Sequence, residues 1–180
     1  MKQIILFAFA TFFTAAAVQA QSPLKIGPSI EVGLPLNTGD VYMMSAGVGI
    51  NGRYVMPFHK PLEVIVGVSY YRFLQNAENR DAGIKDTQYV PIRVGARYNF
   101  PLSFPLYAKL DGGAVVSLQK KTEDYPKEPT GILVSPGVGT SLGPVEVELR
   151  YENWTSGTWE GYYGSRPSTD IVGLRFAYFF

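Results

Sequence analysis

The chain has 180 residues, which is enough for one domain and too few for two full-size cores. Hydrophobic residues make up 46% and charged residues 17%, a balance that argues against a disordered chain, and the formal net charge of +1 excludes the basic excess of a nucleic-acid binder. The sequence has no cysteine, which excludes disulfides, thiolate metal sites and a cysteine nucleophile, and its single histidine is His59.

Residues 1–20 have the pattern of a secretory signal peptide. Lys2 precedes an apolar run from Ile4 to Val18, and the run ends in a small-residue cleavage site at Ala20. A transmembrane anchor is the alternative, but about 15 apolar residues fall short of the roughly 20 that a spanning helix needs. We therefore expect cleavage after Ala20, export of the protein, and one mature domain of residues 21–180.

Alternation of apolar and polar residues with a period of two dominates the mature chain. In the clearest segment, Val145–Glu152, one face carries Val, Val, Leu and Tyr while the other carries Glu, Glu, Arg and Glu. Pro35, Pro91 and Pro136 fall inside such segments and are expected at bulges or strand ends, because proline has no amide donor. The alternation predicts eight strands, near residues 26–36, 42–56, 62–73, 87–100, 105–118, 131–142, 144–154 and 169–180.

The predicted connectors alternate in length. Those near 56–61, 100–105 and 142–144 are short and rich in proline. Those near 74–87, 119–130 and 154–168 are long and polar or aromatic, and the connector at 37–40 belongs with them by order although it is short. Short turns on one rim and long loops on the other are typical of outer-membrane barrels.

The two faces of the strands favour a membrane barrel over a soluble one. A soluble barrel places its aliphatic face inside, whereas a membrane barrel places it outside. The charged face holds six acids and six bases, as expected where charges neutralise one another in a confined lumen, although solvated surfaces also alternate in sign. Glycines on that face favour the lumen, because a narrow interior needs small residues beside long ones. The predicted lumen network consists of Glu31, Arg53, Glu63, Arg93, Arg97, Lys109, Asp111, Glu146, Glu148, Arg150, Glu152 and Arg175.

An internal repeat places an arginine and an aromatic residue side by side. Arg53 precedes Tyr54 in a segment that recurs around Arg97, and a related segment contains Arg175. The repeat reflects either a duplicated hairpin or a shared structural task. Antiparallel pairing centred on Phe58 further predicts that Arg53 lies opposite Glu63 on the inward face.

The end of the sequence alternates Val172, Leu174, Phe176, Tyr178 and Phe180. With this aromatic strand the sequence resembles the small eight-stranded outer-membrane proteins, the class that includes OmpX and the OmpA membrane domain. More closely it resembles the broad family described as an outer membrane protein β-barrel domain, or porin family. The resemblance covers all of residues 21–180.

That resemblance implies an all-β fold, namely an eight-stranded antiparallel up-and-down transmembrane β-barrel with a charge-filled lumen. It implies a location in the outer membrane of a Gram-negative type of cell, with membrane lipid as the surroundings. It also implies insertion by the barrel-assembly machinery, with Phe176, Tyr178 and Phe180 as the assembly signal. It carries little about activity, because function within the family is diverse.

Candidate catalytic groups are few. Barrel enzymes that modify lipid A carry a catalytic histidine and serine near the outer rim, whereas His59 lies in a predicted short turn on the opposite rim. Glu146, Glu148 and Glu152 fit an acid/base pair or a cation site, but their basic neighbours favour an ion network. We expect no catalytic residue, no metal site, no cofactor and no enzymatic activity.

The predicted loop 154–168 contains both tryptophans of the sequence. Trp154 fits an aromatic belt at the membrane interface. Trp159, Tyr162 and Tyr163 fit either that belt or a contact surface for an unknown extracellular ligand.

The predicted function is that of a monomeric, structural outer-membrane protein that displays loops for adhesion or ligand contact. A small porin-like channel for ions or small solutes is the main alternative, and it is opposed by size, because side chains fill the interior of an eight-stranded barrel. A lipid-modifying enzyme and a soluble periplasmic carrier are the remaining alternatives.

Overall fold

The computed structural model describes residues 23–37, 42–59, 61–76, 78, 81, 86–118, 131–155 and 168–180. The predicted signal peptide at 1–20 lies outside the described residues, as do Trp159, Tyr162 and Tyr163.

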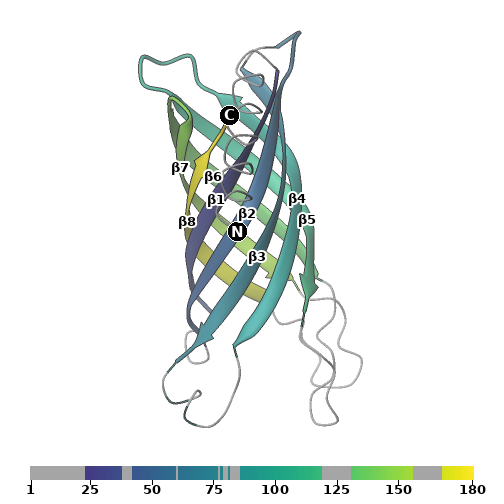
Figure 1. The fold of residues 1–180 in the computed structure, drawn as a ribbon, viewed down its shortest axis with the longest axis vertical. Coiled ribbons are helices and arrows are strands. Elements are labelled where there is room, and N and C mark those ends of the chain that lie inside the picture. Colours follow the sequence, from purple (N-terminus) through teal and green to yellow (C-terminus); the bar gives the residue numbers. More distant parts are fainter. Residues whose placement is uncertain are drawn as a thin grey trace, which may run out of the picture.

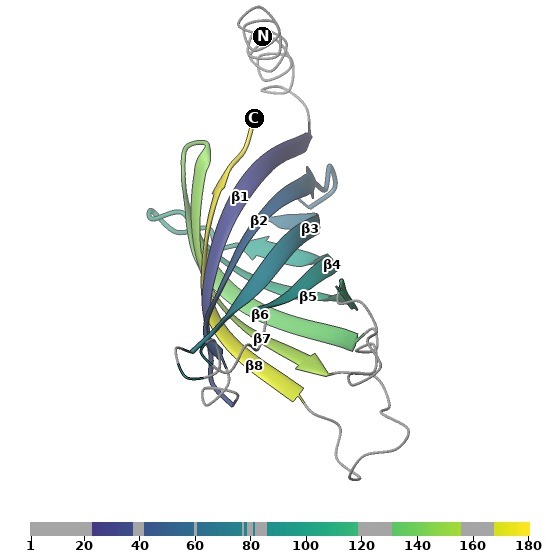
Figure 2. The same ribbon diagram turned by 60° about the horizontal axis from the view of Figure 1, so that its bottom comes forward.

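Eight strands form a closed antiparallel barrel in which each strand pairs with its neighbours in sequence, and β1 pairs with β8 to close it (Figures 1 and 2). The predicted eight-stranded up-and-down barrel is therefore confirmed, and each predicted segment agrees with a strand to within two residues at either end. The strands are β1 (Leu24–Pro35), β2 (Tyr42–Val55), β3 (Leu62–Gln75), β4 (Thr87–Asn99), β5 (Leu106–Ser117), β6 (Gly131–Leu142), β7 (Val145–Thr155) and β8 (Ser168–Tyr178).

The prolines occupy places where one side of the ladder is interrupted. Pro35 is the last residue of β1. Pro91 pairs with Val115 of β5, but the pairing between β3 and β4 is interrupted beside it. Pro136 pairs with Leu110 of β5, and the pairing between β6 and β7 is likewise interrupted. A missing amide donor on one side of each proline accounts for these gaps, and the strands continue through them.

The connectors between β2 and β3, β4 and β5, and β6 and β7 are short and meet at one rim, at the top of Figure 1, which we call the short-turn rim. The other four connectors, of which all but the one between β1 and β2 are long, join the strands at the opposite rim, which we call the long-loop rim. In the turn between β6 and β7, Gly143 has a φ of 64°, a left-handed conformation that suits glycine and a tight hairpin.

The outside of the barrel is apolar. Large aliphatic side chains point outward from the strands, with exposures from 38% for Ile26 to 68% for Ile132, and Val66 and Val94 lie between these values. A continuous apolar exterior is unfavourable in water and is the surface that a barrel presents to lipid. The predicted assignment of the two faces is therefore confirmed for these residues.

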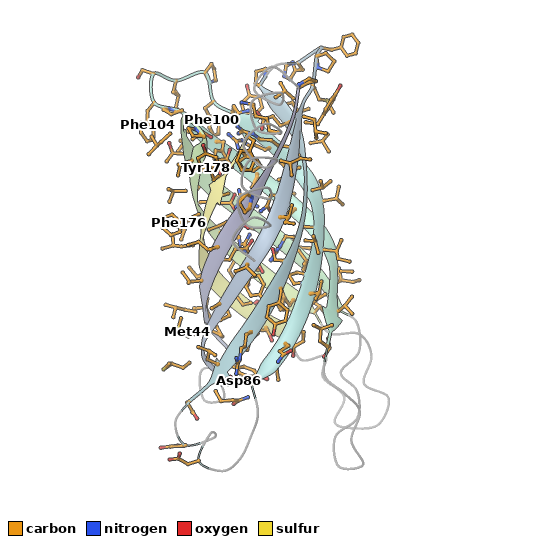
Figure 3. All side chains as sticks on the ribbon, viewed as in Figure 1. Met44, Asp86, Phe100, Phe104, Phe176 and Tyr178 are labelled. Carbon is orange, nitrogen blue, oxygen red and sulfur yellow. The ribbon has the colours of Figure 1, made fainter. Side chains whose placement is uncertain are left out.

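Aromatic side chains gather on the outer surface near the short-turn rim (Figure 3). The rings of Tyr98 and Phe100 lie 5.5 Å apart, and those of Tyr178 and Phe180 lie 5.1 Å apart, both edge to face. Aromatic rings at this level are the interfacial belt of a membrane barrel.

Within the described part of the chain, no helix is long and apolar enough to span a bilayer.

Candidate functional site: the barrel lumen

All twelve residues of the predicted lumen network lie inside the barrel, with exposures between 0% and 8%. They come from every strand except β6. Beside the ion network, strand β6 contributes the small residues Ser135, Gly137 and Gly139 instead. A side chain at Gly139 would overlap the ring of Tyr107, with a Cβ only 2.5 Å from its hydroxyl oxygen. The small inward face of β6 thus leaves room for the long charged side chains of the neighbouring strands. We call the twelve residues the ion network.

Three arginines converge on Glu146 of β7. Arg53 of β2 and Arg97 of β4 both donate to its Oε1, and Arg175 Nη2 of β8 lies 3.3 Å from its Oε2. These are the three arginines of the internal repeat, and each is followed by an aromatic residue that faces outward. The repeat therefore serves one structural task, which is to bring three guanidinium groups from different strands onto a single carboxylate near the short-turn rim.

The predicted opposition of Arg53 and Glu63 is wrong by two residues. Arg53 pairs with Ile65, and Glu63 pairs with Val55. The hairpin is centred one residue later than predicted, on His59, because two successive turns of the backbone connect the strands, with hydrogen bonds His59 N to Met56 O and Leu62 N to His59 O.

As a result, Glu63 is only loosely associated with Arg53, at 3.9 Å between Nη1 and Oε2. It lies directly across from Arg97 of β4, with 3.6 Å between Oε2 and Nε. Its Oε1 accepts a 2.9 Å hydrogen bond from Asn99 Nδ2. The nearest ionic partner of Arg53 is Glu146 on the far side of the lumen rather than its hairpin neighbour.

In the middle of the lumen, Glu148 contacts charged and polar side chains from neighbouring strands. Lys109 Nζ lies 2.8 Å from its Oε1 and also contacts Asp111 at 2.5 Å. Arg175 Nη2 lies 2.7 Å from the other oxygen, which also accepts a 3.0 Å hydrogen bond from the Tyr107 hydroxyl. Both oxygens of this carboxylate are thus engaged with cationic groups.

Toward the long-loop rim, Glu31 and Glu152 share Arg150. The Arg150 guanidinium donates to Glu31 through Nη2 and lies 2.7 Å from Glu152 Oε1 through Nε. Arg93 Nη2 contacts Glu152 Oε1 at 2.9 Å. The Tyr71 hydroxyl donates to Glu31 Oε2, and Ser69 donates to Oε1 at 3.0 Å.

The three carboxylates weighed as an acid/base pair or a cation site, Glu146, Glu148 and Glu152, each contact at least two cationic side chains. Such pairing offsets the high cost of burying charge. The geometry therefore supports an ion network, because each of these three carboxylates is engaged by cationic side chains.

Between the ion network and the long-loop rim, aromatic rings fill the lumen. Phe73 packs edge to face against Tyr42, Tyr89 and Trp154, with ring centroids 5.2 to 5.4 Å apart, and Tyr71 packs against Trp154 at 5.6 Å. Edge-to-face packing of this kind adds to the stabilisation from burial. We call these five residues the aromatic cluster. The buried aliphatic residues Val115, Leu133 and Ile171 pack with it.

Trp154 is not in an interfacial belt, as the sequence analysis predicted, but inside the lumen with 5% exposure. It lies two residues after Glu152 on the same strand and therefore shares the inward face. Its Nε1 donates a 2.7 Å hydrogen bond to Glu152 Oε2, which links the aromatic cluster to the ion network. The spacing of two residues from Glu152 in the predicted strand 144–154 indicates the inward face, but the start of the predicted loop at the same residue led to the belt interpretation.

Tyr42 reaches the lumen through an irregularity. The pairing of β2 with β3 shifts register between Tyr42 and Met44, which is a β-bulge. A bulge inserts one residue and so reverses the faces that follow it. The simple alternation of β2 places Tyr42 outside, and the bulge brings it opposite Gln75 and against Phe73.

The other candidate residues lie elsewhere. His59 is exposed in the turn between β2 and β3, at the short-turn rim. Phe176 and Tyr178 point outward near the same rim (Figure 3), and the backbone N–H of Phe180 donates to Ile26 O at 3.1 Å.

No protein-family model matches the sequence, and no curated protein matches it significantly. Among solved structures, Neisserial surface protein A is similar with a TM-score of 0.56 and 13% identity, over 88% of this chain and 98% of that chain. This protein has the fold of the small eight-stranded outer-membrane barrels. The N-terminal β-barrel domain of Pseudomonas aeruginosa OprF is similar with a TM-score of 0.52 and 11% identity, over 87% of this chain and 97% of that one. At these identities the likeness concerns the fold alone, which the resemblance of the sequence predicted.

Proposed function

We propose that the protein is an integral outer-membrane protein whose barrel serves as a closed anchor that displays the long loops. One observation carries the proposal: the lumen is occupied by the ion network and, toward the long-loop rim, by the aromatic cluster. A filled interior gives rigidity and closure but leaves little room for a substrate or a permeating solute.

The proposed location follows from the exterior. An apolar outer surface with an aromatic belt requires lipid around it. Residues 1–20 serve as a cleaved signal peptide in this proposal, and 21–180 form the membrane domain, which is monomeric. The outward-facing Phe176, Tyr178 and Phe180 at the end of β8 are the segment that the barrel-assembly machinery reads.

The displayed surface is proposed to include Trp159, Tyr162 and Tyr163. Large aromatic side chains on a loop provide contact area for a partner at low conformational cost. The loop between β7 and β8 thus becomes the candidate site of adhesion or ligand contact. We infer no enzymatic activity, because His59 is remote from the buried carboxylates and those carboxylates are engaged by cations.

A small porin-like channel is the second candidate. The lumen does contain a cavity, of about 20 Å³. A cavity this small is far from a continuous aqueous path between the two rims. The paired charges around it oppose permeation further, because an ion that passes must displace an existing partner.

Accessibility of the two rims on intact cells tests the proposal. A short epitope inserted between Gly157 and Thr158 is expected to bind antibody on intact cells, with the protein in the outer-membrane fraction. The matched insertion after Phe58, in a short turn, is expected to bind only after the outer membrane is permeabilised. Reversed accessibility, or recovery of the protein in the soluble fraction, would contradict the proposed function.

A further inference from the structure

The turn between β4 and β5, residues 101–105, is apolar and uncharged, and we call it the β4–β5 turn. Its sequence is Pro-Leu-Ser-Phe-Pro, and no charged residue stands between Arg97 and Lys109 in the sequence. Leu102 and Phe104 of this turn are 60% and 54% exposed. Exposed apolar side chains that gather in one place mark an interaction surface.

The base of the β4–β5 turn is fixed on two sides. The N–H of Phe100 donates to Leu106 O at 2.9 Å across the base. The carbonyl of Pro105 accepts a 3.2 Å hydrogen bond from Ser141 N of β6. From this base the turn projects sideways past the hairpin of β6 and β7, at the upper left of Figure 1 and at the left of Figure 2, and Phe104 lies at its outer side in Figure 3. The turn therefore extends into the surroundings of the barrel rather than over the lumen.

The surface next to the β4–β5 turn is the lipid-facing exterior. Tyr98 and Phe100, a ring pair of the aromatic belt, come directly before the turn in the sequence. Leu142, at the end of the neighbouring strand β6, is 56% exposed at the same rim. The turn is thus continuous with the surface that the barrel presents to lipid. That continuity favours lipid as the material that covers Leu102 and Phe104.

We propose that the β4–β5 turn is an interfacial anchor, which inserts Leu102 and Phe104 between the phospholipids of the leaflet on the side of the short-turn rim. This inference rests on the proposed function, because it requires a barrel that spans a membrane. Apolar side chains that lie in the membrane interface reach about 5–10 Å into the boundary between headgroups and acyl chains. The turn brings no charge that would have to lose its water there. An anchor of this kind holds the β5–β6 side of the barrel at a fixed depth.

The turn between β2 and β3 provides a contrast at the same rim. Its Phe58 is 99% exposed, but His59 and Lys60 follow directly in the sequence. A charged side chain so close to Phe58 opposes insertion into lipid, because charge is costly to remove from water. We therefore expect Phe58 to lie in water, although it is more exposed than either apolar side chain of the β4–β5 turn.

Fluorescence quenching at single introduced cysteines tests the anchor, because the sequence has no cysteine of its own. The fluorophore bimane is attached at Leu102→Cys, Phe58→Cys or Val94→Cys, each in the full barrel in lipid nanodiscs, where aqueous iodide reaches both faces of the bilayer. We expect brominated phosphatidylcholine to quench the label at Leu102→Cys nearly as strongly as the label at Val94→Cys. We expect iodide to quench the label at Leu102→Cys several-fold less than the label at Phe58→Cys.

Val94 points outward from the middle of β4, so its label separates two kinds of failure. If brominated lipid does not quench the label at Val94→Cys, the barrel does not lie in lipid, and the proposed function fails together with the anchor. If Val94→Cys is quenched but iodide quenches Leu102→Cys as strongly as Phe58→Cys, the turn lies in water and the anchor alone is overturned. Protection of Leu102→Cys from both quenchers would indicate contact with a second copy of the protein and would overturn the anchor as well.

A charge introduced into the turn gives a second result with the same label. Phe104→Asp, combined with labelled Leu102→Cys, is expected to draw the turn into water and to raise iodide quenching toward the value for Phe58→Cys, because an ionised carboxylate is costly to bury. The fold should persist, since backbone groups close the base of the turn. Phe104→Tyr is the matched control and should keep the protection, because tyrosine suits the membrane interface. Equal protection in the aspartate and tyrosine variants would overturn the insertion of this turn.

Discussion

The ion network and the aromatic cluster close the same lumen by different chemistry. Around Glu146 and Glu148, long charged side chains cross the barrel and contact partners on distant strands. Around Phe73, rings from four strands pack edge to face against one another. Trp154 belongs to the second region and donates a hydrogen bond into the first.

The two regions contribute to the stability of the barrel in different ways. An ion pair in a buried site contributes little net stability, but removal of one partner leaves an unpaired charge and is strongly destabilising. The ion network therefore specifies which strands face each other across the lumen. The barrel is destabilised when one charged residue of the network is removed. The aromatic cluster contributes through buried area, so it tolerates a smaller ring better than a missing one.

The largest effect is expected from Glu146→Ala, because three arginines lose their common acceptor. Breaking a buried ion pair costs about 3–5 kcal/mol, and the loss of three contacts places this variant at or above the upper end. Urea unfolding in lipid vesicles measures it. Glu146→Gln, which keeps the shape and one acceptor oxygen, is the matched control and should lose less. A loss below about 1 kcal/mol for Glu146→Ala would contradict the role of this residue.

Trp154→Ala tests the aromatic cluster. The loss of a buried tryptophan is expected to cost about 3–5 kcal/mol in the same unfolding measurement. Trp154→Phe should recover most of this, because a ring is retained, and should still lose the hydrogen bond to Glu152. If Trp154→Phe were as damaging as Trp154→Ala, the hydrogen bond rather than ring packing would hold this region together.

Val66→Arg tests the assignment of the outer face. Because side chains alternate between the two faces of a strand, the same assignment places the ion network and the aromatic cluster inside. Val66 points toward lipid, and a charge near the middle of the bilayer costs about 2–4 kcal/mol. Val66→Leu is the control and should fold like the wild type. Equal stability of the arginine variant in lipid would reverse the assignment of the faces.

The smallest effect is expected in a double-mutant cycle of Arg53→Ala and Glu63→Ala. The two groups are 3.9 Å apart, so their coupling should fall near the lower end of the range of about 0.5–3 kcal/mol for interacting residues. The cycle of Arg53→Ala with Glu146→Ala should give a clearly larger coupling, since that contact is direct. The reverse order would mean that the hairpin neighbour is the true partner of Arg53.

Local patterns were enough to predict the strands and their faces. A period of two depends only on neighbouring residues, so Ile30 and Glu31 could be assigned to opposite sides without knowledge of the rest of the barrel. The turns were also predictable in position, but the centre of the hairpin at His59 depended on backbone hydrogen bonds that the composition does not reveal.

The partners across the lumen could not be predicted. Arg53 of β2 meets Glu146 of β7, and Glu31 of β1 meets Arg150 of β7, because the stagger of a closed barrel sets the relative heights of distant strands. The aromatic cluster was missed for two reasons. A bulge moved Tyr42 to the inward face. Trp154, at the shared end of the predicted strand 144–154 and loop 154–168, was interpreted as an interfacial residue although β7 continues to Thr155.

Conductance in planar lipid bilayers tests most directly whether the two regions together seal the barrel. Wild-type protein, inserted in concentrated potassium chloride, is expected to produce no current steps above the background of protein-free membranes. Reproducible steps from the wild type that disappear after heat unfolding would contradict a closed lumen and would favour the small channel instead.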